Sequence, residues 1–238
     1  MSDKEENNIQ RFSELDSNKL VEGKEREIAI QIEEDIMKQN EILANRINQE
    51  LKKHKIKSFD VVGAIGAGKT EIIEKIVGKL SSQYRILVIC GDVTTRVDAN
   101  RIERHNAETI QINTGRECAL NSYHINQIIK YKNLNDYDLI IVENVGNLIC
   151  PSDFILGTDK RITVVSITEG EWVIEKHPML FKMSDIAVIN KMDLIEVLGT
   201  NVEKMKRDAL TINPDIEVIT TSAKTGNNID KLIQSLGL

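Results

Sequence analysis

Short apolar runs alternate with amphipathic stretches along most of the chain after residue 55. Several runs are continuous in Ile, Val and Leu, which is typical of strands covered by helices on both faces. We predict strands at 58–63, Ile86–Cys90, Thr109–Ile112, Leu139–Glu143, Ile162–Ile167, Ile186–Ile189 and Ile216–Thr221. Apolar residues at helical spacing predict helices at 70–81, 99–105, 116–132, 173–183, 201–211 and 228–236. This alternation predicts an α/β fold with a mostly parallel, doubly wound sheet and helices on both of its faces.

The chain before residue 55 has a different pattern. Residues 1–22 are polar and charged, which is typical of a disordered tail. Residues 23–54 form the pattern of one amphipathic helix, with an apolar stripe at Ile28, Ile32, Ile36, Leu43, Ile47 and Leu51. This stripe either packs on the flank of the following domain or contacts a partner or a second copy. Residues 55–238 are expected to form a single domain.

Composition narrows the class of protein. The 238 residues carry a formal net charge of −6, and a chain without basic excess is a poor candidate for wholesale binding of nucleic acid. No apolar run approaches the length of a membrane span, and the polar N-terminus does not resemble a secretory signal. Three cysteines at irregular spacing do not form a disulfide framework. These features indicate a soluble protein of a reducing cytoplasm.

The most specific motif is the segment from Gly63 to Thr70, which has the spacing G-x-x-x-x-G-K-T between a predicted strand and a predicted helix. Glycines let backbone N–H groups close around phosphate oxygens, and the N-terminus of the helix adds partial positive charge. In such a loop the lysine reaches the outer phosphates and the Thr hydroxyl binds Mg²⁺. We therefore expect a P-loop NTPase whose nucleotide is held by Gly63, Ala64, Gly66, Ala67, Gly68, Lys69 and Thr70.

A second pair of motifs concerns the base. Asn190, Lys191 and Asp193 fit N-K-x-D at the carboxyl end of a predicted strand, where ligands of open α/β sheets bind. A carboxylate only accepts hydrogen bonds, and guanine, unlike adenine, offers two donors side by side, so Asp193 is expected to select guanine. Asn190 would brace the loops, and the stem of Lys191 would cover one face of the base. The later segment Ser222, Ala223 and Lys224 matches a second guanine loop, in which the Ala223 N–H would donate to the guanine carbonyl oxygen.

Carboxylates at the ends of two further predicted strands are candidates for the magnesium site. Asp92 follows the second strand and Glu143 ends the fourth, so both can approach an ion bound to phosphate and Thr70. Lys69 and Asp98 are the candidate catalytic residues, Asp98 beside the attacking water. Asp98 has an equally weighted structural alternative as the N-cap of the helix that begins at Ala99. No glutamine is evidently placed to orient water, which predicts slow intrinsic GTP hydrolysis completed by a partner or a second subunit.

Two of the cysteines have unusual neighbours. Cys118 lies in the segment N-T-G-R-E-C at the predicted start of a helix, and Cys150 lies in E-N-V-G-N-L-I-C-P just beyond Glu143. Cys90 lies inside a predicted strand and is expected to be a small core residue. An isolated cysteine of this kind is more often structural than functional, so the local sequence alone leaves the role of Cys118 and Cys150 open.

Together these segments resemble the hydrogenase maturation GTPases of the HypB family, within the P-loop GTPases of the SIMIBI type. The resemblance is carried by residues 63–70, 91–93, 113–118, 143–151, 168–170, 175–178 and 190–193, which occur in the family's order over residues 55–238. The resemblance implies a cytoplasmic GTPase that forms a homodimer on binding GTP. It further implies an interface site for Ni²⁺ or Zn²⁺ at Cys118 and Cys150. Nickel would pass to a [NiFe]-hydrogenase large-subunit precursor with the help of an accessory metallochaperone, without nucleic acid or membrane.

The chain departs from the family pattern at one position. The family metal site includes a histidine directly after the first cysteine, and residue 119 here is Ala. Two cysteines from each subunit could still supply four thiolates, a set that suits zinc. His124 is the nearest substitute ligand, with an ordinary surface or core histidine as the alternative.

Three rival functions remain at this stage. One is a GTP-dependent switch that binds a partner enzyme without metal. Another is the related GTPase of urease nickel delivery, although Cys150 and Pro151 are followed by Ser rather than His. The third is a small-molecule kinase, which the guanine motifs disfavour.

Overall fold

The computed structural model describes residues 35–92, 97–115 and 117–238. The chain divides into two compact units, Met1–Gln39 and Asn40–Leu238. Residues 35–53 are helical, which agrees with the described part of the predicted amphipathic helix, and residues 1–34 lie outside the description. Within the second unit, Ala44, Ile47 and Leu51 are almost fully buried, so this part of the apolar stripe packs on its own domain.

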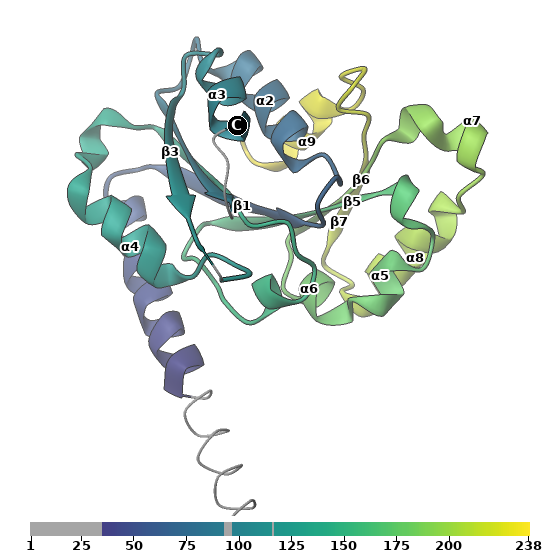
Figure 1. Cartoon of the computed structure of the whole chain (residues 1–238), viewed down its shortest axis with the longest axis horizontal. Helices are drawn as coiled ribbons and strands as arrows, with labels where there is room; N and C mark the ends of the chain where they lie inside the picture. Colours follow the sequence, from purple (N-terminus) through teal and green to yellow (C-terminus); the bar gives the residue numbers. More distant parts are fainter. Residues whose placement is uncertain (1–34, 93–96, 116) are drawn as a thin grey trace, which may run out of the picture. The chain divides into compact units, whose positions relative to one another are not determined.

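The second unit is built on a single sheet of seven strands in the order β3-β2-β4-β1-β5-β6-β7. Every neighbouring pair is parallel, and Figure 1 shows helices on both sides of the sheet. The strands are β1 (Lys57–Gly63), β2 (Ile86–Asp92), β3 (Glu108–Asn113), β4 (Leu139–Glu143), β5 (Lys160–Ser166), β6 (Ile186–Asn190) and β7 (Glu217–Thr220). All seven predicted strands are therefore confirmed, with differences of one or two residues at their ends.

Helices cover both faces of this sheet, as predicted. The α-helices are α2 (Lys69–Leu80), α3 (Val97–Glu103), α4 (Ser122–Tyr131), α5 (Val173–Lys176), α6 (Pro178–Lys182), α7 (Ile195–Leu198), α8 (Val202–Ile212) and α9 (Ile229–Ser235). Short 3-10 helices are η1 (Leu134–Asp136), η2 (Cys150–Ser152), η3 (Ile167–Glu169) and η4 (Met192–Leu194). No helix among the described residues is long and apolar enough to cross a membrane.

Alternate residues of the same strand enter different cores. In β2, Val88 joins the core beneath α2, α3 and α9, whereas Leu87 and Ile89 join the core beneath α4 and the N-terminal helix. Further along the sheet, Ala187 and Ile189 of β6 pack against α5, α6 and α8. Because both sides of each central strand are buried, the strands read as continuous apolar runs rather than as alternating ones.

Two predicted helices differ from the structure. The helix predicted over 116–132 begins only at Ser122, because the Asn121 side chain caps it by accepting from the N–H of His124. Cys118 therefore lies in a loop and not at the start of a helix. The helix predicted over 173–183 is divided into α5 and α6 at Pro178, whose ring nitrogen has no hydrogen to donate.

Candidate nucleotide and cysteine sites

The glycine-rich loop connects β1 to α2 at the carboxyl edge of the sheet. Gly66 and Gly68 have φ values of +80° and +100°, the left-handed region that favours glycine. A Cβ atom on Gly68 would lie 2.3 Å from Nδ2 of Asn190, so the loop also needs glycine there for close packing. This strand–turn–helix arrangement directs backbone N–H groups and the start of α2 toward one point, as phosphate binding requires.

Lys69 is almost buried, and its ammonium group folds back over the loop. Its Nζ donates to the carbonyl oxygens of Gly63 and Ala64, each at 3.1 Å. The group is thus held above the loop where an outer phosphate would bind. A phosphate oxygen in that position would offer a charged acceptor in place of the two carbonyl oxygens.

Thr70 and Glu143, two of the residues expected to bind magnesium, are in direct contact. The Thr70 hydroxyl donates to Oε1 of Glu143 at 2.6 Å, although the two residues are 73 positions apart. A hydroxyl and a carboxylate oxygen are the ligand types that Mg²⁺ accepts beside nucleotide phosphates, so this pair fits the ion. Asp92 ends β2 and Asp98 lies in the first turn of α3, but their side chains lie outside the described part of the structure.

The glycine-rich loop, Lys69, Thr70 and Glu143 line a cavity of about 540 Å³, a volume that suits a nucleotide. Its walls also include Ile65, Arg101 and Lys191. Arg101 forms an ion pair with Glu74 at 2.7 Å. Sequence reasoning did not identify Arg101, because a single arginine on a helix gives no motif.

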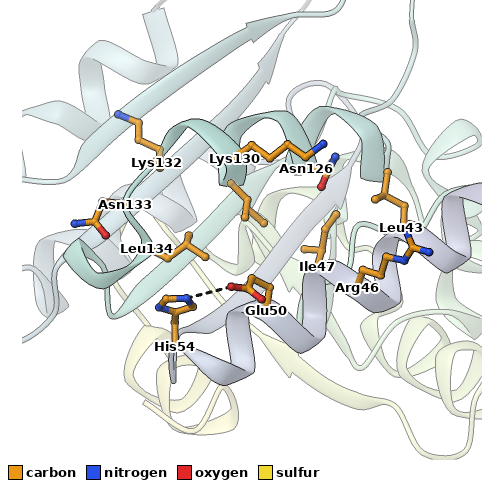
Figure 2. Close-up of a pocket in the computed structure, with 11 residues that line it drawn as sticks. Leu43, Arg46, Ile47, Glu50, His54, Asn126, Lys130, Lys132, Asn133 and Leu134 are labelled. Atoms are coloured by element: carbon orange, nitrogen blue, oxygen red, sulfur yellow. Dashed lines mark hydrogen bonds and ion pairs between the residues drawn. The ribbon is translucent and has the colours of Figure 1, made fainter.

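A cavity of about 600 Å³ lies elsewhere, between the N-terminal helix and α4. Figure 2 shows Ile47 and Leu134 near its floor and His54 bonded to Glu50 at one end. Lysine and arginine side chains line its rim, but it has neither a glycine turn nor a hydroxyl–carboxylate pair. The smaller cavity beside the glycine-rich loop therefore remains the candidate nucleotide site.

The two guanine motifs meet through Asn190, which is 1% exposed. Its Nδ2 donates to the carbonyl oxygen of Ala67 at 3.0 Å, which ties the base loop to the phosphate loop. Its Oδ1 accepts from the Ala223 N–H and the Thr221 hydroxyl, both at 3.1 Å. Asn190 thus braces three segments, as its motif predicted. The Ala223 N–H, expected to face guanine, is bonded within the protein instead.

Asp193 and Ser222 place the two base-recognition loops side by side. The Ser222 hydroxyl donates to Oδ1 of Asp193 at 2.6 Å. This hydrogen bond is the main reason that the pKa of Asp193 lies below its usual value, with further contributions from Lys224 and Lys191. The carboxylate is therefore charged and accepts hydrogen bonds, as selection of guanine requires. Lys191 has a left-handed φ of +64°, and its side chain lines the nucleotide cavity.

Glu169 is a further carboxylate in this region. Its Oε1 accepts from the backbone N–H of Ser166 at 2.7 Å. Burial raises the pKa of Glu169, while the Ser166 N–H and the positive charges of Lys191 and Lys69 act in the opposite direction. The sequence identified Glu169 only through the family resemblance, because its proximity to both lysines arises from the fold.

The segment after β4 runs along the phosphate loop. Asn144 donates its N–H to Val61 at 2.9 Å, and Asn147 donates its N–H to Gly63 at 3.1 Å. Between them, a Cβ atom on Gly146 would lie 2.3 Å from Cγ1 of Ile65 and 3.1 Å from its Cα. The phosphate loop and the segment after β4 therefore pack together as one unit.

Asn147 also organises the turn that contains Cys150. Its Oδ1 accepts from the N–H groups of Ile149 at 2.7 Å and Cys150 at 3.3 Å. Its Nδ2 donates to Sγ of Cys150 at 3.3 Å. Asn147 lies in a segment that carries the family resemblance, but its sequence context alone assigned it no role. The Asn-x-x-Cys spacing is compatible with an Asx turn, but the contact with Gly63 required the fold.

Beyond the cysteine, the chain is held by a buried arginine. Arg161 donates to the carbonyl oxygens of Pro151 and Phe154 at 2.8 and 2.7 Å, and its Nε pairs with Asp60 at 2.9 Å. Arg161 is 5% exposed and its partner carboxylate is also buried. These bonds fix the far side of the turn to the sheet.

Cys118 and Cys150 are joined by a disulfide, with their Cα atoms 6.0 Å apart. The expectation that the cysteines form no disulfide is therefore wrong for this pair, because β3 and β4 flank β2 and bring their following loops together. Cys90 is buried in the core, as expected. The two metal-ligand candidates do share one site. Among the described residues, however, no group of three or more potential ligands is assembled within this single subunit.

His124 has a structural role in this loop. Its Nδ1 accepts from the N–H of Asn121 at 3.3 Å, which completes the cap of α4, and its Nε2 lies 3.3 Å from Oε2 of Glu117. Both ring nitrogens are thus engaged, which supports the alternative of an ordinary structural histidine. Ala119 is 4% exposed, so the departure from the family pattern lies on a buried side chain beside the exposed Cys118.

Comparisons with known proteins agree with this geometry. The family model for the CobW/HypB/UreG nucleotide-binding domain matches residues 58–220. The chain is 47% identical over 205 residues to the probable hydrogenase maturation factor HypB of Methanocaldococcus jannaschii, covering 86% of this chain and 93% of that protein. It is 34% identical over 207 residues to HypB of Escherichia coli K12, covering 87% and 71%.

Two solved structures share the fold. HypB from Archaeoglobus fulgidus matches with a TM-score of 0.78 and 40% identity over 84% of this chain and 97% of that one. HypB from Helicobacter pylori in complex with nickel matches with a TM-score of 0.76 and 28% identity over 84% and 95%. From the family match and these identities over most of both sequences, the chain belongs to the HypB hydrogenase maturation factors within the CobW/HypB/UreG family of P-loop proteins.

Proposed function

We propose that this protein is a GTPase that controls a transition-metal site during maturation of a [NiFe]-hydrogenase. It binds GTP with Mg²⁺, hydrolyses it to GDP and phosphate, and forms a homodimer in the GTP state. The dimer takes up nickel at Cys118 and Cys150 and passes it to the hydrogenase large-subunit precursor, with an accessory metallochaperone. The observation that carries this proposal is the double contact of Asn147, which bonds Gly63 of the phosphate loop and Cys150 of the candidate metal site.

The described side chains supply most of the nucleotide chemistry. Lys69 is positioned to bind the outer phosphates, and Thr70 with Glu143 would hold the magnesium ion. An ion held there would neutralise charge that develops on the phosphates when the terminal phosphoryl group is transferred to water. Asp193 accepts from the two guanine donors, and Asn190 keeps the base and phosphate loops in register. Asp98 remains our candidate for orienting the attacking water. Its role would be tested by phosphate release from Asp98→Asn.

The cysteine site fits a thiophilic metal. Thiolates are preferred ligands of zinc and are also accepted by nickel, and two from each subunit of a dimer would complete four. The nickel complex of the Helicobacter pylori relative favours nickel as the cargo. Ala119 removes an imidazole from the set, so Zn²⁺ is expected to compete strongly.

A titration of the reduced protein with Ni²⁺ and with Zn²⁺ tests the proposal. We expect stoichiometric binding that is tighter in the GTP-analogue form than in the GDP form, together with dimerisation seen by light scattering. Cys118→Ala should lose the metal while keeping its affinity for GDP. Equal metal affinity in both nucleotide states would contradict the coupling.

A second candidate is a GTP-dependent switch that licenses a partner enzyme without binding metal. The observation that favours it is Ala119, together with the lack of a third ligand near the cysteine pair among the described residues. In that case the reduced dimer would bind neither ion stoichiometrically but would still exchange GDP for GTP and change its oligomeric state.

A further inference from the structure

The bond between Cys118 and Cys150 places a covalent modification on the candidate metal site. The two residues are 32 positions apart in sequence and come from loops after different strands, with a Cα separation of 6.0 Å. That separation is within the usual range for disulfides, so the bond needs no rearrangement of the backbone. We infer that Cys118 and Cys150 form a reversible dithiol–disulfide site, and that its oxidation excludes metal.

Exposure distinguishes this pair from the third cysteine. Cys118 is exposed and Cys150 is half-buried, so both sulfur atoms can meet a small reagent from solution. Cys90 is 2% exposed inside β2 and has no route to such a reagent in the folded state. The folded protein should therefore exchange two of its three thiols and retain the third.

Neighbouring residues also fix the position of Cys150, which we expect to act second in thiol–disulfide exchange by closing the protein disulfide. Asn147 donates from Nδ2 to the sulfur of Cys150, and its Oδ1 accepts from the backbone N–H of Cys150. These contacts fix the position of the Cys150 sulfur, which as a thiolate is the group that attacks the mixed disulfide. Arg161 fixes the carbonyl oxygen of the next residue, Pro151, so the position of Cys150 does not depend on the disulfide alone.

The co-reactant is a low-molecular-weight disulfide, R–S–S–R. The thiolate of Cys118, the more exposed sulfur, attacks one sulfur of this reagent, breaks its S–S bond and releases one R–S⁻. The thiolate of Cys150 then attacks Sγ of Cys118 in the mixed disulfide and releases the second R–S⁻. Two electrons pass from the cysteines to the reagent, and the two protons of the protein thiols end on two R–SH molecules. An excess of R–SH reverses both steps.

The consequence for metal follows from the ligand chemistry. Only thiolates bind nickel or zinc in the manner required here, and a disulfide offers none. The oxidised protein would therefore not bind metal at this site, whether GDP or GTP is bound. This consequence rests on the proposed metal site, whereas the redox chemistry of the pair does not.

The experiment uses the full chain with GDP, equilibrated in buffers of glutathione disulfide and glutathione. Free thiols are counted after denaturation, the intact mass is measured, and the same samples are titrated with Ni²⁺. We expect three thiols in reductant and one in oxidant, with the mass of a monomer that has lost two hydrogen atoms. We also expect nickel binding in the reduced sample only, restored by added thiol.

Variants of each cysteine show which two residues form the disulfide. Cys118→Ser and Cys150→Ser should each stop at a mixed disulfide or remain reduced, whereas Cys90→Ala should form the bond like the parent. Because Cys118 is exposed, its serine variant is expected to fold, and GDP binding verifies this.

The possible contrary results are distinct. Three free thiols at equilibrium in glutathione disulfide, or a disulfide between subunits on a non-reducing gel, would overturn the redox site. Equal nickel affinity in oxidised and reduced protein would overturn the exclusion of metal. A bond that forms as described in a protein whose reduced form binds no nickel would leave the redox site standing and refute the proposed metal function.

Discussion

Asn147 donates its backbone N–H to the carbonyl oxygen of Gly63, the same oxygen that accepts from Nζ of Lys69. Both donors lie at 3.1 Å. The side chain of Asn147 simultaneously bonds Cys150. One carbonyl oxygen thus links Lys69, the candidate phosphate-binding lysine, to the turn that contains Cys150. A change at the phosphates has a short route to the cysteine pair, through two contacts that the fold already provides.

The first prediction concerns that route. Asn147→Ala removes three side-chain hydrogen bonds at the Cys150 turn but keeps the backbone bond to Gly63. We expect GDP affinity to change by less than about threefold, and nickel affinity of the reduced protein to fall by about 10- to 100-fold, as for other residues that orient metal ligands. Calorimetry with both ligands measures the two effects.

Asn45→Ala is the matched control, because Asn45 is exposed on the N-terminal helix. It should leave both affinities unchanged. A parallel loss of GDP and nickel binding in Asn147→Ala would show that the residue supports the whole loop rather than the cysteine turn.

The second prediction concerns the packing of the post-β4 segment on the phosphate loop. In Gly146→Ala the new Cβ would meet Ile65, whose backbone atoms lie only 3.1 Å away. The clash should displace the loop and weaken GDP binding by roughly tenfold or more, since small displacements of binding groups have large effects. Fluorescent-nucleotide titration gives the constants.

Ile65→Ala provides the comparison, because it removes the side-chain part of the clash at a residue that is itself 86% exposed. Adding Gly146→Ala to Ile65→Ala should lower GDP affinity by a smaller factor than adding it to the parent. Equal GDP affinity in Gly146→Ala and the parent would mean that the loop accommodates the added methyl group without loss of binding.

The third prediction concerns selection of the base. Asp193→Asn replaces one acceptor oxygen with an N–H donor, which then faces a guanine donor. We expect GDP affinity to fall by about 100-fold, and xanthosine diphosphate, which carries an oxygen in place of the exocyclic amine, to bind better than GDP. Competition between the two nucleotides reports the ratio.

Asp215→Asn is the control for the same loss of charge at an exposed position. It should retain the guanine preference. An Asp193→Asn protein that still favours GDP over xanthosine diphosphate would remove Asp193 from the base site.

The fourth prediction is a pH dependence of stability. Arg85 donates to Asp138 from its backbone N–H, Nε and Nη2, and these bonds lower the pKa of Asp138 to about 2 from 3.8. Because the folded-state pKa is the lower one, the stabilisation is complete above about pH 4 and is lost as the pH falls toward 2. Solvent screening at this partly exposed pair leaves about 1 kcal/mol.

Asp138→Asn should therefore lower the unfolding temperature at pH 7 by about 2–4 °C, and the difference from the parent should shrink below pH 4. Calorimetric scans from pH 7 to pH 3 measure it. A difference that stays constant over that range would assign the effect to packing instead of charge.

The amino-acid sequence by itself determined the fold class, the seven strands and the phosphate loop, because each depends on local patterns. Continuous Ile and Val runs require burial on both faces, and the glycine spacing requires a tight turn before a helix. Asn190 and Asp193 could likewise be proposed for the base site, since their residue types and spacing suit the chemistry of guanine. The late start of α4 was missed because the Asn121 cap outweighed the apolar pattern before it.

Only the tertiary structure decided which loops meet. The contacts of Asn147 with Gly63, of Asn190 with Ala223, and of Cys118 with Cys150 join residues 84, 33 and 32 positions apart. Each depends on the strand order, which places β1 beside β4, β2 between β3 and β4, and β6 beside β7. Sequence spacing carries no information about that order, so the pairing of the cysteines and their link to the phosphate loop could be found only in the folded chain.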